Sequence, residues 1–330
     1  IMVGSFILLG YFGKEIYNER PPIPAEFVDE SGKTIYTEAD ILAGQSAWQS
    51  IGGMSVGTVW GHGAYQAPDW TADWIHREVL GWLDQQAQRE YGKPYDQLSE
   101  RDQATLHYDA QQAFRKNTYD QATGKVTLSA DRIRSIEGVA AYYDKLFGSD
   151  PELHKLREAY AMKEDTLPDA DKRAKLNAFF FWSAWAASTN RPNLDVTYTN
   201  NWPHEPLIGN QPSAENVIWS ITSVVTLIFG IGSVIWIWAF FTRHEHEEIA
   251  VPAQDPLTLV KLTPSQKALG KYLLIVAALF FVQVMLGGFT AHYTVEGQDF
   301  YGIPVADWLP YSLTRTWHIQ SSIFWIATGF

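Results

Sequence analysis

Residues 217–241 read VIWSITSVVTLIFGIGSVIWIWAFF, a stretch without one charged side chain. At about 1.5 Å of rise per residue this stretch forms roughly 37 Å of helix, enough to cross a hydrocarbon core about 30 Å thick. A second uncharged run covers residues 272–293 and is interrupted only by Gln283 and His292. The two runs predict two membrane-spanning helices.

Shorter apolar runs lie at both ends of the sequence. Residues 1–11 are apolar but too few to span a bilayer, and residues 312–330 are apolar after Arg315. Ile1 is not a translation start and no helix stop precedes Phe330, so we expect a fragment of a longer protein, cut inside a helix at each end. A signal peptide is the alternative for the first run, although no cationic segment or cleavage site accompanies it.

The loop between the two long runs, residues 242–271, indicates the orientation. It contains four cations close to the membrane ends: Arg243, Lys261, Lys267 and Lys271. Positive charge at these positions favours the cytoplasmic side, whereas acidic residues count little. We therefore expect residues 12–216 to form a domain outside the cytoplasm.

The composition excludes several classes of protein. The 330 residues include 25 basic and 37 acidic ones, and the net charge of -12 argues against a general nucleic-acid binder. The absence of cysteine excludes disulfides, thiolate zinc sites, iron–sulfur clusters and thioether-attached haem. The mean hydropathy of -0.17 suggests a soluble protein, but this average blends an acidic domain with concentrated apolar runs.

The extramembrane segment has the signals of a helical domain. Thr37 with Asp40, and Ser99 with Asp102, have the spacing of capping boxes, and Asp150 precedes a proline at a first helical position. Helices are predicted near residues 38–51, 68–91, 99–116, 130–147, 151–163 and 169–187. The sequence as a whole predicts an all-α protein.

The run from Trp60 to Asp69 is the sharpest local motif. Its glycines can aim backbone carbonyls at a ligand, and Tyr65, two residues after Gly63, can add a phenol oxygen. Oxygen donors of this kind suit a hard cation such as calcium. The alternative is a tight turn before the helix that starts near Pro68.

Three residues at the outer end of the second span suggest redox chemistry. His292, Glu296 and Phe300 are spaced by four residues, so they share one face if the helix continues. A histidine and a carboxylate there can take protons from a lipid-soluble redox carrier, while the phenylalanine stacks on its ring. An interfacial histidine with solvated neighbours is the alternative.

A further histidine, His318, lies in an apolar segment where ionisable groups are costly and usually functional. Neutral imidazole is a strong haem-iron ligand. Arg315, one turn earlier, can pair with a haem propionate or extend to the lipid headgroups.

Together these segments closely resemble the quinol-dependent nitric oxide reductases, single-chain relatives of the haem–copper oxidases. The resemblance covers the whole sequence, and the match over 60–74 is highly specific. The motifs that carry it are Gly44-Gln-Ser-Ala-Trp48, Ser50-Ile-Gly-Gly53, the run from Trp60 to Trp74, Asn200-Asn-Trp-Pro-His-Glu-Pro206 and the run from Gly287 to Gly302.

The resemblance implies a domain organisation. Residues 1–11 become a truncated membrane helix, and residues 12–216 a periplasmic cytochrome-c-like domain that has lost its haem. Residues 217–241 become the joining span, 242–271 a cytoplasmic loop, and 272–330 the first two helices of a haem–copper-oxidase-like bundle. Gly53, Val56 and Gly57 stand where a Cys-x-x-Cys-His motif would bind haem.

The resemblance also implies roles for single residues. His292, Glu296 and Phe300 match the family's quinol pocket, and His318 matches an axial ligand of the low-spin haem b. The Gly63 carbonyl and the Tyr65 hydroxyl match calcium ligands. The ligands of the high-spin haem b3 and of the non-haem iron are expected beyond Phe330.

The implied activity reduces two nitric oxide molecules, with two electrons and two protons, to nitrous oxide and water. The implied setting is the bacterial inner membrane, with the quinol pool, the lipid bilayer, the remainder of the same chain and a second copy in a homodimer as partners. Two other readings stay open. One is a quinol-dependent oxygen reductase of the same superfamily, and the other is a membrane sensor with an extracellular domain.

Overall fold

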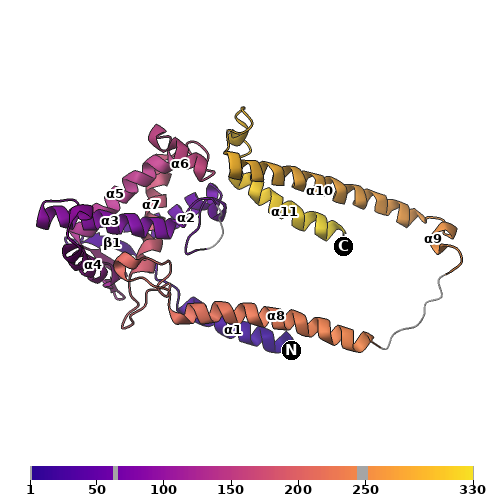
Figure 1. Ribbon diagram of the computed structural model, residues 1–330, viewed down its shortest axis with the longest axis horizontal. Helices are drawn as coiled ribbons and strands as arrows, with labels where there is room; N and C mark the ends of the chain where they lie inside the picture. The colour runs from indigo at the N-terminus through magenta and orange to yellow at the C-terminus, as the bar shows by residue number, and fades with distance from the viewer. Residues whose placement is uncertain (1, 62–65, 244–251, 330) are drawn as a thin grey trace. The chain divides into compact units, whose positions relative to one another are not determined.

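The structure, a computed structural model, describes residues 2–61, 66–243 and 252–329 (Figure 1). It divides into two compact units. The first consists of residues Ile1–Pro212 and Leu286–Thr316, and the second of Ser213–Met285 and Trp317–Phe330. The extramembrane domain and the end of one long helix therefore belong to one unit.

The first unit is built mainly from helices. They are α1 (Met2–Asn18), α2 (Glu38–Ser50), α3 (Trp70–Tyr91), α4 (Glu100–Arg115), α5 (Ala130–Phe147), α6 (His154–Ala159) and α7 (Ala170–Ser188). Its described residues also form the 3-10 turns η1 (Gly53–Ser55), η2 (Tyr95–Gln97), η3 (Pro151–Leu153), η4 (Pro206–Ile208) and η5 (Val305–Asp307). Five of the six helices predicted in the domain agree with α2, α3, α4, α5 and α7 to within two residues.

The helix predicted over residues 151–163 is shorter than expected. A 3-10 turn and the short α6 replace it, and the chain leaves the helix at Tyr160. Ala161 has a φ of 52°, outside the range of a right-handed helix, and the Met162 N–H bonds back to the Arg157 carbonyl. Good capping signals marked the start of this helix, whereas nothing in the sequence marked its end.

The all-α prediction is roughly right, with a small sheet as an addition to it. The fold is mostly helical, but the described residues include the strands β1 (Glu26–Asp29), β2 (Thr34–Thr37), β3 (Tyr119–Asp120) and β4 (Lys125–Leu128). Their order is β2-β1-β4-β3, with β1 parallel to β4 and the other pairs antiparallel. Strands of two to four residues are too short to show an alternating pattern, which explains why the sequence did not reveal them.

Helix α7 forms the centre of the domain, and every residue from Leu176 to Ser188 in it is buried. Helix α2 packs closely on α7 at Gly44, where an added Cβ would collide with the backbone carbonyl of Lys175. The glycine of the Gly44-Gln-Ser-Ala-Trp48 motif is therefore required by helix packing.

Aromatic rings fill the space between α3, α5 and α7. The Trp74 ring stacks on Tyr143 with centroids 5.2 Å apart, and the Trp70 ring stacks on Phe180 at 5.7 Å. Trp70, Trp74 and Phe180 are fully buried, and Tyr143 is 1% exposed. Large stacked rings of this kind contribute much of the apolar burial of the domain.

One buried ion pair crosses this core. The Arg132 Nε atom of α5 donates to Glu78 Oε1 of α3 at 2.8 Å, and the Trp74 indole donates to Glu78 Oε2 at 3.0 Å. The two charged side chains are 6% and 1% exposed. Breaking such a pair is costly because it leaves a buried charge without its partner.

We predict that Glu78→Gln lowers the free energy of unfolding of the domain by about 3–5 kcal/mol, because Arg132 would stay charged and buried. Chemical denaturation followed by tryptophan fluorescence measures the change. Glu137→Gln, an exposed position on α5, is the control and should change stability by less than about 0.5 kcal/mol. Equal stability of the two variants would contradict a role for the ion pair.

The remaining helices are long and apolar. They are α8 (Ala214–Thr242), α10 (Pro264–Glu296) and α11 (Tyr311–Gly329), with the short α9 (Pro256–Leu259) before α10. Among the described residues two stretches are long and apolar enough to cross a membrane, Val217–Thr242 and Pro264–Glu296. Their side chains are almost entirely exposed within the described residues, unlike those of a soluble core helix, so lipid or further helices must cover them.

Helices α10 and α11 pack side by side in opposite directions (Figure 1). In the second unit the rings of Phe280 and Trp325 meet edge to face at 5.5 Å, and the Trp325 indole donates to Gln283 Oε1 at 2.5 Å. Gln283 interrupts an otherwise apolar run because its amide has a partner on the neighbouring helix.

Candidate functional site

The predicted cluster of His292, Glu296 and Phe300 forms, but not on one helix face. Helix α10 ends at Glu296, and Gly297 turns the chain away with a φ of +92°, a conformation that favours glycine. The turn brings Phe300 back onto His292, so that the two rings stack with centroids 4.3 Å apart and an angle of 6°. The helix does not continue to Phe300, so the three residues do not share one helix face, although their side chains do meet.

The acidic member of the cluster lies beside the histidine. His292 Nδ1 is 3.1 Å from Glu296 Oε2, and the two side chains are 45% and 39% exposed. The pair is therefore accessible to a ligand from outside the helix, with an aromatic ring covering one face of the imidazole. A histidine and a carboxylate in contact can exchange protons with a bound hydroxyl group.

Two aromatic neighbours of this cluster were not predicted from the sequence. The Tyr301 ring lies 4.9 Å from Phe289 and 5.0 Å from Phe300, measured between centroids. Burial and the charge of Glu296 raise the pKa of the Tyr301 hydroxyl, which therefore stays protonated as a hydrogen-bond donor. The only signal for Tyr301 in the sequence was its place between Phe300 and Gly302, which marks a turn.

Residues 272–291 explain why the cluster lies where it does. They contain no charged side chain, and at about 1.5 Å per residue they form roughly 30 Å of helix, the thickness of a hydrocarbon core. Lys271 lies at one end of this stretch and His292 at the other. The cluster is therefore expected at a membrane surface.

His318 lies on α11, where its environment defines its tautomer. Its Nδ1 atom is 2.9 Å from the backbone carbonyl of Gln283. A carbonyl can only accept, so Nδ1 carries the hydrogen and Nε2 keeps its lone pair. Metal-binding histidines are commonly oriented by such a bond, and the half-buried His318 therefore fits an axial ligand of haem iron.

No larger metal site accompanies it in the described part of the chain, since no three His, Cys, Asp or Glu side chains there gather to hold a metal ion. Arg315, one turn before His318, donates from Nη1 to the Ser55 hydroxyl at 3.1 Å. Arg315 thus contacts the segment over residues 53–57.

The segment over residues 53–57 packs against the aromatic core. The Trp70 indole donates to the Val56 carbonyl at 2.7 Å, and a Cβ added to Gly57 would collide with the same indole. Gly57 also has a φ of +77°. A histidine at position 57 is therefore incompatible with the observed position of Trp70.

Gly63 and Tyr65, the predicted calcium ligands, lie outside the described residues. The chain on both sides of them is held by Asp69, whose Oδ2 atom accepts from the Thr58 hydroxyl at 2.6 Å and from the Gly61 N–H at 2.5 Å. The same carboxylate caps α3 through the Ala72 N–H.

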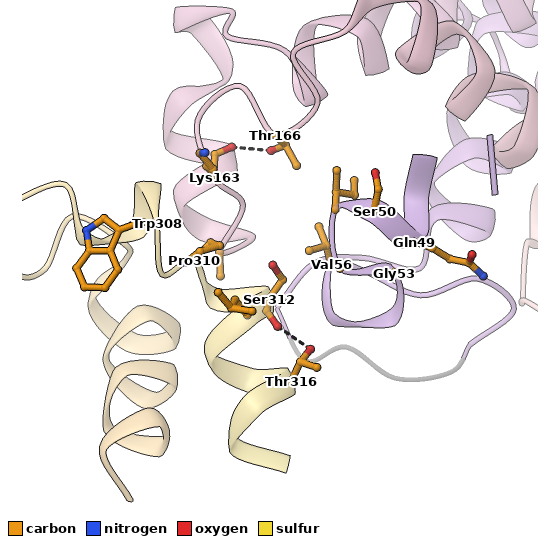
Figure 2. Close-up of a pocket in the computed structure, with 14 residues that line it drawn as sticks. Gln49, Ser50, Gly53, Val56, Lys163, Thr166, Trp308, Pro310, Ser312 and Thr316 are labelled. Carbon is orange, nitrogen blue, oxygen red and sulfur yellow. Dashed lines mark hydrogen bonds between the residues drawn. The ribbon is translucent and has the colours of Figure 1, made fainter. Parts of the chain in front are cut away.

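A cavity of about 690 Å³ lies in the first unit, with Ser50, Gly53 and Val56 on one side and residues at the start of α11 on the other (Figure 2). Its lining includes the hydroxyl groups of Ser312 and Thr316. None of His292, Glu296, Phe300 and His318 lines it. The cavity and the histidine cluster are therefore separate features.

An extramembrane helical domain attached to apolar helices, with a histidine oriented for metal ligation, is expected of a membrane-bound redox protein. Residues 24–204 match the family model of the NorB cytochrome c-like domain, a domain of nitric oxide reductases. The match covers more than half of the chain, so the chain belongs to the NorB family of nitric oxide reductases. No curated protein sequence matches it.

Two glycine variants test the packing of residues 53–57. Gly57→Ala should lose about 1–2 kcal/mol to its left-handed backbone and about 1–3 kcal/mol more to the collision with Trp70. Gly53→Ala should lose only the first contribution, because the space beside it is open and its φ is also positive, at +51°. Thermal and chemical unfolding measure both, and equal losses would show that Trp70 does not restrict position 57.

Proposed function

We propose that this chain is the electron- and proton-entry part of a quinol-oxidising nitric oxide reductase. The observation that carries the proposal is the His292–Glu296 pair beneath the Phe300 ring, at the end of a helix long enough to span a membrane. Family membership supports reduction of nitric oxide rather than oxygen. The use of quinol rests on the cluster and on the resemblance of its motif.

The arrangement suits a flat, lipid-soluble donor. A quinol ring can lie against the exposed aromatic groups, while its hydroxyl meets the imidazole or the carboxylate. Oxidation of quinol to quinone releases two protons and two electrons. His292 and Glu296 take the protons, since they are within hydrogen-bond distance of one another and accessible.

His318 is the proposed ligand of the low-spin haem b. Its Nδ1–H is held by the Gln283 carbonyl, which leaves Nε2 for the iron. Arg315, one turn earlier in the sequence, would pair with a haem propionate. When bound, the haem supplies a one-electron acceptor. The implied reaction, in which two electrons and two protons reduce two nitric oxide molecules to nitrous oxide and water, would require a high-spin haem b3 and a non-haem iron, whose ligands the resemblance places outside residues 1–330.

The packing of the extramembrane domain, residues 12–216 and called the outer domain from here on, supports entry of electrons from quinol. Trp70 occupies the space beside Gly57 that a haem-ligating histidine would need, and no cysteine is present to attach a haem. We therefore infer a cytochrome-c-like domain that does not carry electrons. The cations of residues 243–271 favour a cytoplasmic loop, which would make this domain periplasmic in a bacterial inner membrane.

Further parts of the proposal rest on the resemblance alone. Calcium would bind through the Gly63 carbonyl and the Tyr65 hydroxyl, with a further ligand from the remainder of the chain. A homodimer within the lipid bilayer is the proposed assembly.

The first test concerns the haem. We expect His318→Ala to abolish the low-spin haem b absorption bands of the purified full-length protein, because the imidazole is the proposed axial ligand. His204→Ala, at an exposed loop position, should leave the spectrum unchanged. An unaltered spectrum in the His318 variant would contradict the assignment of His318 as the haem b ligand.

The second test concerns proton transfer. We expect Glu296→Gln to lower kcat/KM for quinol about 100-fold, with a normal haem spectrum, because the amide cannot accept a proton. Turnover is measured as nitric oxide consumption with a short-chain quinol, and oxygen is offered in parallel to test the alternative substrate. Glu152→Gln, whose side chain is 84% exposed on the outer domain, is the control. Equal activity of the two variants would remove Glu296 from the mechanism.

A further inference from the structure

The turn that follows α10 is held by a carboxylate from the outer domain. Glu158, on α6, accepts a hydrogen bond at its Oε2 atom from the backbone N–H of Gln298, at 2.9 Å. Gln298 lies between Glu296 and Phe300, the two residues that the turn must place, and is 2% exposed. Glu158 therefore contacts the backbone between the end of α10 and Phe300, whose ring stacks on His292.

Gln298 also connects this turn to α11. Its Oε1 atom accepts from the Tyr311 N–H, at 3.4 Å, at the first residue of the helix that carries His318. Tyr311 is 2% exposed and packs with Ala161, three residues after Glu158, and with Tyr293 of α10. The outer domain and the turn therefore both contact Tyr311, at the start of α11.

The fit between Glu158 and the turn is close. A Cβ added to Gly297 would lie 2.7 Å from Glu158 Oε2, so the carboxylate rests directly against the glycine backbone. The glycine is thus required twice, for its positive φ and for the approach of the carboxylate.

The charge state of Glu158 depends on its surroundings. Burial raises the pKa of its carboxyl group and the nearby charge of Asp299 raises it further, while the Gln298 N–H and His154 act in the opposite direction. His154 is on α6 itself, and Asp299 is on the turn. A charged carboxylate accepts a hydrogen bond more strongly than a protonated one. The bond from the Gln298 N–H to Glu158 therefore weakens as the pH falls through the raised pKa of Glu158.

We propose that Glu158 is a positioning residue for quinol oxidation, acting through the backbone of Gln298 to hold Phe300 over His292. The proposal rests on the proposed quinol site and gives the outer domain a part in the reaction that requires no haem. Its geometry predicts an effect on quinol binding rather than on the chemical step.

The test uses the purified full-length protein with a short-chain quinol as donor and nitric oxide as acceptor. We expect Glu158→Ala to raise KM for quinol about tenfold with kcat within about twofold, since a hydrogen bond to a charged group is typically worth this much. Glu158→Gln keeps an acceptor oxygen but cannot ionise. Its KM at neutral pH should lie between those of the unaltered protein and Glu158→Ala, because a neutral amide oxygen accepts a hydrogen bond more weakly than a carboxylate.

The pH profile separates positioning from general stability. In the unaltered protein KM should rise as the pH falls through the pKa of Glu158, and in Glu158→Gln this part of the rise should disappear. Glu152→Ala, the exposed control, should keep both the KM and its pH profile. Gly297→Ala perturbs the same contact from the turn and should raise KM as Glu158→Ala does, so the test survives if one variant fails to fold.

Two further outcomes are distinguishable by the haem spectrum. If quinol fails to reduce the haem of the unaltered protein while dithionite succeeds, the proposed quinol site is wrong and this proposal falls with it. If quinol reduces that haem but Glu158→Ala and Glu158→Gln match the unaltered protein in KM and pH profile, only the role of Glu158 is wrong.

Discussion

The hydrocarbon core of a membrane allows a single chain segment only if its backbone is fully hydrogen-bonded within itself. Helix α10 meets this constraint over residues 272–291, which have neither a charge nor a break. The candidate site begins at His292, directly after that stretch. Irregular backbone therefore begins only at the end of the helix, where Gly297 can turn the chain.

The turn at this end depends on contacts from several elements. Gly297 reverses the chain, Phe300 returns to the His292 ring, and the Gln298 backbone bonds to Glu158 of the outer domain. On α10 the carbonyl of Gln283 fixes the tautomer of His318 on the neighbouring helix. The turn that carries Phe300 and the imidazole of His318 are therefore each held by a hydrogen bond between a side chain and a backbone group.

Aromatic rings fill the core of the outer domain beside residues 53–57. Trp70 bonds to the Val56 carbonyl, blocks space at Gly57 and stacks on Phe180 of the central helix. These rings contribute much of the apolar burial of the domain. The core of the domain also contains the buried Glu78–Arg132 pair.

The sequence by itself determined the long apolar helices, five helices of the outer domain and the residue types of the site, because capping residues and uncharged runs are local signals. Only the tertiary structure decided the small sheet, the end of α6, the turn at Gly297 and the contacts of Tyr301 and Glu158. Each of these depends on partners far apart in the chain, such as Glu158 and Gln298, and no local pattern encodes which distant groups will meet. The spacing of His292 and Phe300 predicted that their side chains could meet. It did not predict the turn at Gly297, because a continued helix and a turn can both bring the two rings together.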